Sequence, residues 1–461
     1  MLFSSHVFLY GFLPLTLLLY YISPRKLRNP VLLLVSLLFY GWGEPVFLLL
    51  MLATILLNYL CGAWVARLQE KEKKAGYVVA IAVVANLLIL GYFKYAGFLV
   101  KSVQSLVPGF LDGKLPQILL PIGISFYIFQ SLSYVIDVYR KDAPVQKNLL
   151  TFGTYVTLFP QLIAGPIVRY RDVALQMDHR KETVAGFASG VMLFLVGLSK
   201  KVLLANPMGS LWNLAQGEKG TVIAWMGIAA YAMQIYFDFS GYSDMARGLG
   251  RMFGFEFLEN FNYPYISRSI TEFWRRWHIS LSTWFREYVY IPLGGNRRGL
   301  PRQVLNLLVV WMLTGLWHGA SWNFVLWGLY YAVFLILEKL WLLKVLKRLP
   351  GLLSGGYTIV TVLLGWALFY FEDLSALKIF FGKLFTLVPV EYAGRNLISA
   401  YLPLMAVAIL ACTPVAKNLV AGAEQKPLVR VGKLLAAAAA LLLCIAALAS
   451  QSYNPFIYFR F

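Results

Sequence analysis

Long apolar runs recur along the whole chain and are separated by short polar loops. Clear examples are "VFLYGFLPLTLLLYY" (7–21), "PVFLLLMLATILLNYLCGAWVA" (45–66) and "VGKLLAAAAALLLCIAALAS" (431–450). A run of about 20 apolar residues is long enough to cross the hydrocarbon core of a bilayer as a helix. The pattern predicts an all-α, polytopic membrane protein with about a dozen spanning or partly spanning helices.

The predicted spans can be placed from these runs and from the loops between them. They lie near residues 7–23, 30–43, 45–66, 76–97, 184–204, 221–242, 304–317, 320–338, 356–371, 397–412 and 432–450. No internal repeat and no interdomain linker is visible. We therefore expect one membrane domain over 1–461, with N-terminal spans in 1–110, a core in 111–340 and C-terminal spans in 341–461.

Two further apolar segments, 115–141 and 149–170, contain residues that interrupt a helix. The first includes Pro116, Pro121 and Gly123, and the second includes Pro160 and the pair Gly165-Pro166. Proline removes a backbone donor, and interrupted segments at membrane depth are tolerated only inside protein or beside a cavity. The two segments indicate either the wall of an internal chamber or kinks that serve packing alone.

Composition and charge agree with a membrane location. Hydrophobic residues make up 59% of the chain and charged residues 13%, which is too few to cover a soluble core of this size. The 41 Lys and Arg against 21 acids would suggest nucleic-acid binding in a soluble protein. Here the cations occupy short loops, which favours the positive-inside rule and anionic lipid headgroups over any nucleic-acid partner.

The N-terminal segment predicts an orientation. Its basic residues follow the first apolar run, in "SPRKLRN" (23–29), so we expect a first span with an extracytoplasmic N-terminus rather than a cleaved signal peptide. Cys61, Cys412 and Cys444 lie in apolar runs without metal-ligand spacing. Each is expected to be a buried apolar residue.

The stretch 264–302 differs from the spans because it is basic and aromatic. Its apolar residues recur at three- and four-residue steps, at Phe273, Trp277, Leu281, Trp284 and Tyr288. This spacing predicts an amphipathic helix that lies in the membrane interface or enters the bilayer from the cytoplasmic side. Anchoring alone would not explain the histidine at its centre.

The chain has only four histidines. His6 precedes the first span and His179 lies in a polar loop, so both are expected to be solvated. His278 and His318 each lie among aromatic and apolar residues. Ionisable groups within the membrane are costly and are functional by default.

Several roles remain open for His318, in "TGLWHGASWNF" (314–324). The structural alternative is a hydrogen-bonded residue in a helix interface, and the Gly315–Gly319 spacing would permit close helix approach. The functional alternatives are a proton relay, a metal ligand or a general base. A metal is disfavoured because no HxxxH, HExxH or cysteine partner accompanies it. A neutral imidazole in a low-dielectric site suits a base that deprotonates a hydroxyl.

Intramembrane carboxylates occur in "QIYFDFSGYSDMARGLGRMFG" (234–254). Asp244 and Arg247 are three residues apart and can pair within a helix. Asp238 and Ser240 flank an expected break at Gly241. A structural polar network is the favoured interpretation, and catalysis by Asp238 is the alternative.

These elements together resemble the membrane-bound O-acyltransferase family, in its bacterial polysaccharide-modifying branch. The resemblance rests on "FWRRWHISLSTWFREYVYIPLGG" (273–295) followed by "LWHGASWNFVLWG" (316–328). It extends in the same order to "LPIGISFYIFQSLSYVIDVYR" (120–140), "LFPQLIAGPIVRY" (158–170), "DFSGYSDMARGLGRMFGF" (238–255) and "NPFIYFRF" (454–461).

The resemblance implies a fold of many helices around a tunnel, with His318 at the position of the family's essential histidine. A second signature position, an asparagine in lipid- and protein-acylating relatives, falls on His278. Further tunnel-lining candidates are Trp317, Gly319, Trp277, Asp238 and Ser240.

The implied reaction takes an acyl group from a cytoplasmic thioester, acetyl-CoA or an acyl carrier protein, which acts as a substrate rather than a permanently bound cofactor. Arg275, Arg276, Arg297 and Arg298 are candidates for binding donor phosphates. The acyl group then passes to an extracytoplasmic partner enzyme that esterifies a polysaccharide. The implied location is the bacterial cytoplasmic membrane.

Two rival functions remain. One is D-alanyl transfer from a carrier protein to teichoic acid, and the other is a proton-coupled transporter or export channel that uses His318. A transporter would be expected to show inverted repeats and paired acids along a pathway, and neither is evident in the sequence.

Overall fold

The computed structural model describes residues 1–107, 118–163, 165–421, 426–450 and 456–457, and this part of the chain contains helices and no β-strand. Of "NPFIYFRF" (454–461) it describes only Phe456 and Ile457, and Pro116 also lies outside the described residues.

Eight helices in the described residues are long and apolar enough to cross a membrane. They are Leu48–Glu70, Gly76–Leu106, Val184–Gly217, Thr221–Met252, Gly299–His318, Gly351–Tyr370, Tyr392–Ala411 and Pro427–Ser450. Val7–Ile22 is apolar but shorter. The prediction of a polytopic α-helical membrane protein is confirmed, and several of the remaining predicted spans correspond to partial helices of 9 to 17 residues.

The chain divides into two compact units. Unit 1 comprises Met1–Phe194 and Met245–Leu258, and unit 2 comprises Leu195–Asp244 and Glu259–Phe461. Helices α10 (Val184–Ser199) and α12 (Thr221–Met252) contribute residues to both.

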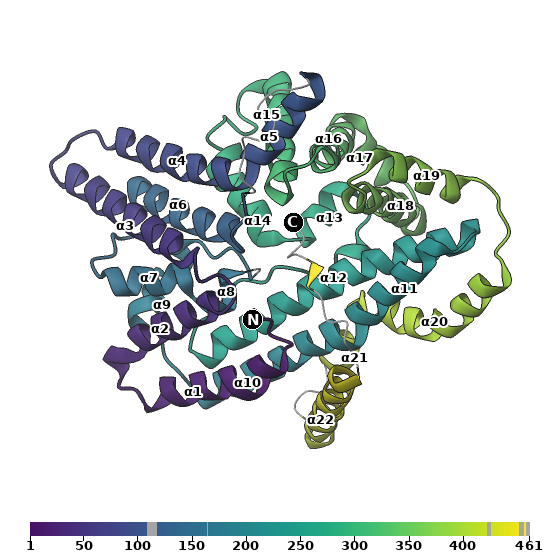
Figure 1. The fold of residues 1–461 in the computed structure, drawn as a ribbon, viewed down its shortest axis with the longest axis horizontal. Coiled ribbons are helices and arrows are strands. Elements are labelled where there is room, and N and C mark those ends of the chain that lie inside the picture. Colours follow the sequence, from purple (N-terminus) through teal and green to yellow (C-terminus); the bar gives the residue numbers. More distant parts are fainter. Residues whose placement is uncertain (108–117, 164, 422–425, 451–455, 458–461) are drawn as a thin grey trace. The chain divides into compact units, whose positions relative to one another are not determined.

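Unit 1 has its most extensive packing between helices that are not consecutive in the sequence. Its helices are α1 (Leu13–Ile22), α2 (Arg28–Gly41), α3 (Leu48–Glu70), α4 (Gly76–Leu90), α5 (Ala96–Leu106), α6 (Ile124–Arg140), α7 (Leu149–Thr157), α8 (Phe159–Leu162) and α9 (Tyr170–His179). α6 packs against α3, α4 and α9, and α7 packs against α2 (Figure 1). α6 lies at the centre of these contacts, and nearly all of its side chains are buried.

The two segments that were predicted to be interrupted are interrupted. α6 begins at Ile124, directly after Gly123, whose φ of +76° is a conformation that favours glycine. In the second segment α7 ends at Thr157 and α8 begins at Phe159, with Pro160 in its first turn. Proline is tolerated there because the first N–H groups of a helix have no intrahelical acceptor.

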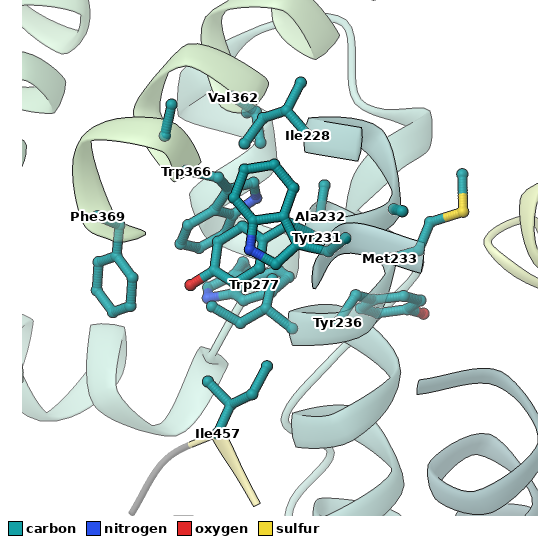
Figure 2. Packing of buried hydrophobic residues seen from close by; sticks show 14 of the residues in the cluster. Ile228, Tyr231, Ala232, Met233, Tyr236, Trp277, Val362, Trp366, Phe369 and Ile457 are labelled. Atoms are coloured by element: carbon teal, nitrogen blue, oxygen red, sulfur yellow. The ribbon is translucent and has the colours of Figure 1, made fainter. Parts of the chain in front are cut away.

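Unit 2 holds the helices that follow α10, and its core is unusually aromatic. Its helices are α11 (Asn206–Gly217), most of α12, α13 (Ile270–Arg276), α14 (Ile279–Phe285), α15 (Gly299–His318), α16 (Trp322–Leu337), α17 (Leu343–Leu346), α18 (Gly351–Tyr370), α19 (Leu374–Phe385), α20 (Tyr392–Ala411), α21 (Val415–Ala421) and α22 (Pro427–Ser450). Figure 2 shows the cluster around Trp277, which packs with Tyr236 of α12 and Trp366 of α18. Most of these rings are fully buried, so they fix the helices around the segment that carries His278.

α15 and α16 form an antiparallel pair with close backbone contact. A Cβ atom at Gly315 would collide with the carbonyl oxygen of Phe324, and one at Gly328 would collide with that of Trp311. The predicted role of Gly315 in close helix approach is confirmed. The glycine that faces it on α16 is Gly328, whose Cα would lie 3.4 Å from a Cβ atom at Gly315.

Two local predictions are wrong. α12 runs without a break through Gly241, where the absence of a side chain lets the helix approach the carbonyl oxygen of Gly197. The predicted amphipathic helix over 273–288 is divided at His278, whose φ of +45° is left-handed and ends helical geometry.

The apolar stripe of this segment does not form a membrane-facing surface. Phe273, Trp277, Leu281, Trp284 and Tyr288 are all buried within the protein. Their helical spacing reflects packing on both sides of the turn at His278. Interfacial anchoring by the stripe is therefore wrong.

Candidate functional site

His318 is the last residue of α15, and three aromatic rings surround its imidazole. The centroids of Trp317, Trp327 and Phe369 lie 5.0, 5.0 and 5.3 Å from that of His318, and all three rings are nearly perpendicular to it. Edge-to-face packing of this kind fixes ring orientation. The side chain is 6% exposed, so the helix end holds a polar group inside an aromatic enclosure.

His278 belongs to the same aromatic cluster. The Trp317 ring, which contacts His318, also lies 5.9 Å from the ring of His278. Phe239 of α12 packs edge-on against His278 at 4.6 Å. The structure thus brings together two histidines that are 40 residues apart, with Trp317 in contact with both.

The protonation pattern of His278 follows from its neighbours. The backbone N–H of Ser280 donates to Oδ1 of Asn260 at 3.1 Å, which identifies that atom as the amide oxygen. Nδ1 of His278 lies 3.2 Å from the same oxygen, so Nδ1 carries a proton and donates it. In a neutral imidazole this leaves the lone pair on Nε2.

Burial keeps His278 neutral. His278 belongs to the segment 253–298, which connects the candidate spans Thr221–Met252 and Gly299–His318 and is not itself a candidate span. Desolvation lowers the pKa of His278 to about 3. At neutral pH the ring therefore has one N–H donor, directed at Asn260, and one basic nitrogen.

Two buried polar atoms at the start of α16 (Trp322–Leu337), the helix that follows His318, have no protein partner. Nε1 of Trp327 and Oδ1 of Asn323 have no hydrogen-bond partner among the described residues. Asn323 is anchored by its Nδ2, which donates to the carbonyl of Phe369 at 3.1 Å. An unpaired buried donor or acceptor is costly, so such atoms indicate bound water or ligand. Both residues belong to the first two turns of α16, and the Trp327 ring lies 5.0 Å from that of His318.

Asp238 takes part in a structural network. Its Oδ1 lies 2.7 Å from Nζ of Lys201, and its Oδ2 accepts the backbone N–H of Ile457 at 2.7 Å. Asp244 pairs with Lys200, also at 2.7 Å. Both carboxylates are thus engaged by lysines of one π-helical turn (Lys200–Ala205), and this supports the structural interpretation over a catalytic Asp238.

The remaining tunnel candidates are buried, but their surroundings differ from the prediction. The space beside Gly319 is filled by the Phe324 ring. Trp277 packs on Trp366 with ring centroids 4.9 Å apart, inside the apolar cluster. Ser240 is buried, and its hydroxyl has no hydrogen-bond partner among the described residues. A tunnel along these residues stays a prediction.

The four arginine candidates separate into two groups. Arg276 is engaged, because it pairs with Glu272 at 2.9 Å and donates to the carbonyl of Asn262 at 3.2 Å. Arg275, Arg297 and Arg298 are exposed. Donor binding by any of them stays a prediction.

A buried carboxylate fixes the helix that precedes His278. Glu338 accepts the backbone N–H groups of Ile270 and Thr271 at 2.6 and 2.8 Å, and the hydroxyl of Thr271 at 2.6 Å. These donors belong to the first turn of α13, where a negative charge is favourable. Glu338 therefore sets the position of α13.

No cluster of three or more His, Cys, Asp or Glu side chains that could hold a metal ion occurs within the residues described. Sequence reasoning did not find Asn260, Asn323, Trp327 or Glu338. None of them belongs to a spacing pattern, and only the fold brings them to the histidines or to α13.

The family to which the chain belongs follows from comparison of its sequence with known proteins. The model of the membrane-bound O-acyltransferase family matches residues 37–348. The chain belongs to this family. It is therefore a multi-pass membrane protein and an acyltransferase that requires an acyl donor.

Several relatives are similar over most of their length. Probable alginate O-acetylase AlgI of Azotobacter vinelandii is 41% identical over the whole of both chains. The protein of the same name from Pseudomonas aeruginosa is 46% identical over 81% of this chain and 73% of its own. Peptidoglycan O-acetyltransferase of Helicobacter pylori is 33% identical over 83% of this chain and 79% of its own. The predicted family and the predicted enzyme class are confirmed.

Proposed function

We propose that this protein transfers acetyl groups from a cytoplasmic thioester, acetyl-CoA, toward an extracytoplasmic polysaccharide, with His318 as the general base. The observation that carries the proposal is the pair of buried histidines, both in contact with Trp317. The other two histidines of the chain are exposed.

The reaction requires one proton acceptor near the reacting hydroxyl. His318 takes the proton from the acceptor hydroxyl while the oxygen attacks the thioester carbonyl. The tetrahedral intermediate then expels the thiolate, which receives the proton from His318. The products are the acetyl ester and free CoA, and the base is regenerated.

The unpaired atoms beside His318 suit this chemistry. The Trp327 Nε1–H is a donor for the carbonyl oxygen as negative charge develops on it. Asn323 Oδ1 is an acceptor for a substrate donor other than the reacting hydroxyl, whose single proton goes to His318. The aromatic enclosure excludes water, which protects the thioester from hydrolysis.

His278 has a separate role in the proposal. Asn260 holds its Nδ1–H and so fixes the imidazole, which we assign to orienting the acceptor or the donor. The exposed Arg275, Arg297 and Arg298 are the candidates for donor phosphates, since Arg276 is engaged by Glu272.

The substrate class rests on the relatives. Two of them are named for acetylation of alginate and one for acetylation of peptidoglycan, and both substrates are glycan polymers. We propose the bacterial cytoplasmic membrane as the location, with the N-terminus outside according to the basic loops. A partner enzyme outside the membrane would complete the transfer to the polymer.

The test uses purified protein in nanodiscs with radiolabelled acetyl-CoA, with and without a candidate partner. Wild type should release CoA and pass on label, and His318→Ala should lower both by at least about 100-fold. Equal activity of the variant would exclude His318 as the base. Turnover only with a D-alanyl carrier protein would favour the teichoic acid reaction, and proton or polymer transport without thioester turnover would favour a transporter.

A further inference from the structure

A polar cavity of about 440 Å³ lies in unit 1, where the α1–α2 loop meets the α9–α10 loop. Five of its lining residues are cationic, namely Arg25, Lys26, Arg28, Arg180 and Lys181. Its two acids are Asp178 and Glu182. The cavity therefore has a net positive lining.

The floor of the cavity is a buried and ordered network. Glu182 pairs with Arg28 at 2.7 Å and lies 3.8 Å from Arg180, so one carboxylate serves two guanidinium groups. Arg180 is held in place by Asn29, whose Oδ1 accepts from it at 2.6 Å, and by the hydroxyl of Tyr20 at 2.9 Å. These contacts fix the positions of the two arginines. One carboxylate carries a single negative charge, so it cannot neutralise the positive charges of both.

The rim adds charge that is not neutralised within the protein. Arg25, Lys26 and Lys181 are exposed, and none of them forms an ion pair with any residue that the structure describes. α2 begins at Arg28 without a side-chain cap, so the positive end of the helix dipole lies at the same place. A phosphate is the group that such a cavity is suited to bind.

Apolar surface adjoins the cationic cavity. Ile22 at the end of α1, Leu175 on α9 and Val184 at the start of α10 are 73, 77 and 89% exposed, and each is within a few residues of the cavity lining. A second cavity of about 600 Å³, lined almost wholly by apolar side chains, extends along α1 and α2, the helices joined by the basic loop. A ligand that fits both features has an anionic head and apolar chains.

We propose that unit 1 binds an anionic phospholipid, with the phosphate in the cavity at Arg28 and Arg180 and the acyl chains along α1 and α2. On the orientation that the basic loops predict, the lipid belongs to the cytoplasmic leaflet. The site is separate from the histidine cluster, and it stands whether or not the proposed acyl transfer is correct.

The experiment is native mass spectrometry of the full-length protein in detergent, titrated with phosphatidylglycerol or with phosphatidylcholine. The rim variant Arg25→Gln/Lys26→Gln/Lys181→Gln leaves the buried network intact. The control Lys71→Gln/Lys73→Gln/Lys74→Gln removes the same charge from the exposed α3–α4 loop of the same unit.

Wild type and control should retain phosphatidylglycerol in preference to phosphatidylcholine, and the rim variant should bind it at least about tenfold more weakly. Equal binding by the rim variant and the control would overturn the proposal. In parallel, inorganic phosphate and CoA are added as competitors at millimolar concentration. Displacement of the lipid from wild type by either anion at that concentration would overturn the proposal and assign the cavity to a soluble phosphate.

Discussion

Oδ1 of Asn260 lies 3.2 Å from Nδ1 of His278, and it also accepts hydrogen bonds from the backbone and the hydroxyl of Ser280. The amide oxygen therefore fixes both the tautomer and the orientation of the imidazole. In metal and catalytic sites, an acceptor of this kind on one ring nitrogen decides which nitrogen remains basic. Asn260 is a positioning residue for His278.

Replacing Asn260 by Asp tests this relationship. A carboxylate at the same place stabilises the imidazolium form, so the pKa of His278 should rise by about 1–3 units. In the pH–rate profile, the rate of acetyl transfer should then fall at a higher pH in the variant than in wild type, where His278 is expected to take up a proton only near pH 3. Ser280→Ala, which keeps the backbone N–H, is the control and should leave the profile in place. An unchanged profile in Asn260→Asp would contradict the assignment.

The low pKa of His278 predicts how stability depends on pH. The unfolded chain takes up a proton at this residue near its usual pKa of 6.5, whereas the folded chain takes it up only near 3. Stability contributed by the neutral ring is therefore present above about pH 6.5 and is lost progressively as the pH falls toward 3.

This dependence can be measured by thermal unfolding in nanodiscs between pH 7 and pH 4. His278→Asn suits the comparison because asparagine tolerates the left-handed backbone and can still donate to Asn260. The melting temperature of the variant should fall less over this range than that of wild type. Parallel curves would assign the acid sensitivity to other groups.

Trp327→Phe separates packing from hydrogen bonding beside His318. The substitution keeps a large ring against the imidazole but removes a buried N–H that has no hydrogen-bond partner within the described chain. Stability should be unchanged or slightly higher, because an unsatisfied donor is lost. Turnover should fall by about 100-fold if that N–H binds the developing oxyanion. Full activity would show that the donor does not contact the substrate.

Gly328→Ala tests the close contact between α15 and α16. The added methyl group would collide with the carbonyl oxygen of Trp311, so the helices must separate near His318. We expect a loss of about 1–3 kcal/mol in stability together with reduced turnover. Gly355→Ala on α18 is the matched control, since a methyl group there meets open space. Equal melting temperatures for the two variants would show that the contact is not tight.

Glu338→Gln tests the anchoring of α13. The variant retains one acceptor oxygen but loses the charge that binds the first turn of the helix. Hydrogen bonds to a charged group are stronger than neutral ones, so unfolding should become easier by about 2 kcal/mol. The exposed Glu372→Gln serves as the control and should have no measurable effect in the same melting experiment.

Much of the architecture could be predicted from the sequence, because membrane spans are long and apolar by physical necessity. The run 221–242 falls within α12, and all but the first three residues of 45–66 belong to α3. The breaks at Gly123 and Pro160 were also predictable, since both residues act on the local backbone. The prediction of one continuous helix over 273–288 was wrong, because a stripe of apolar residues does not show whether the backbone turns at its centre.

The sequence by itself determined the class of protein and the family. It also predicted functional roles for His278 and His318, because a rare ionisable residue in an apolar segment is costly. Only the tertiary structure decided that Trp317 contacts both histidines, that Asn260 fixes the tautomer of His278 and that Glu338 anchors α13. Apart from the Trp317–His318 contact between neighbours, these contacts join residues 18 to 68 positions apart. No local pattern specifies such pairs, since they depend on how the aromatic core packs.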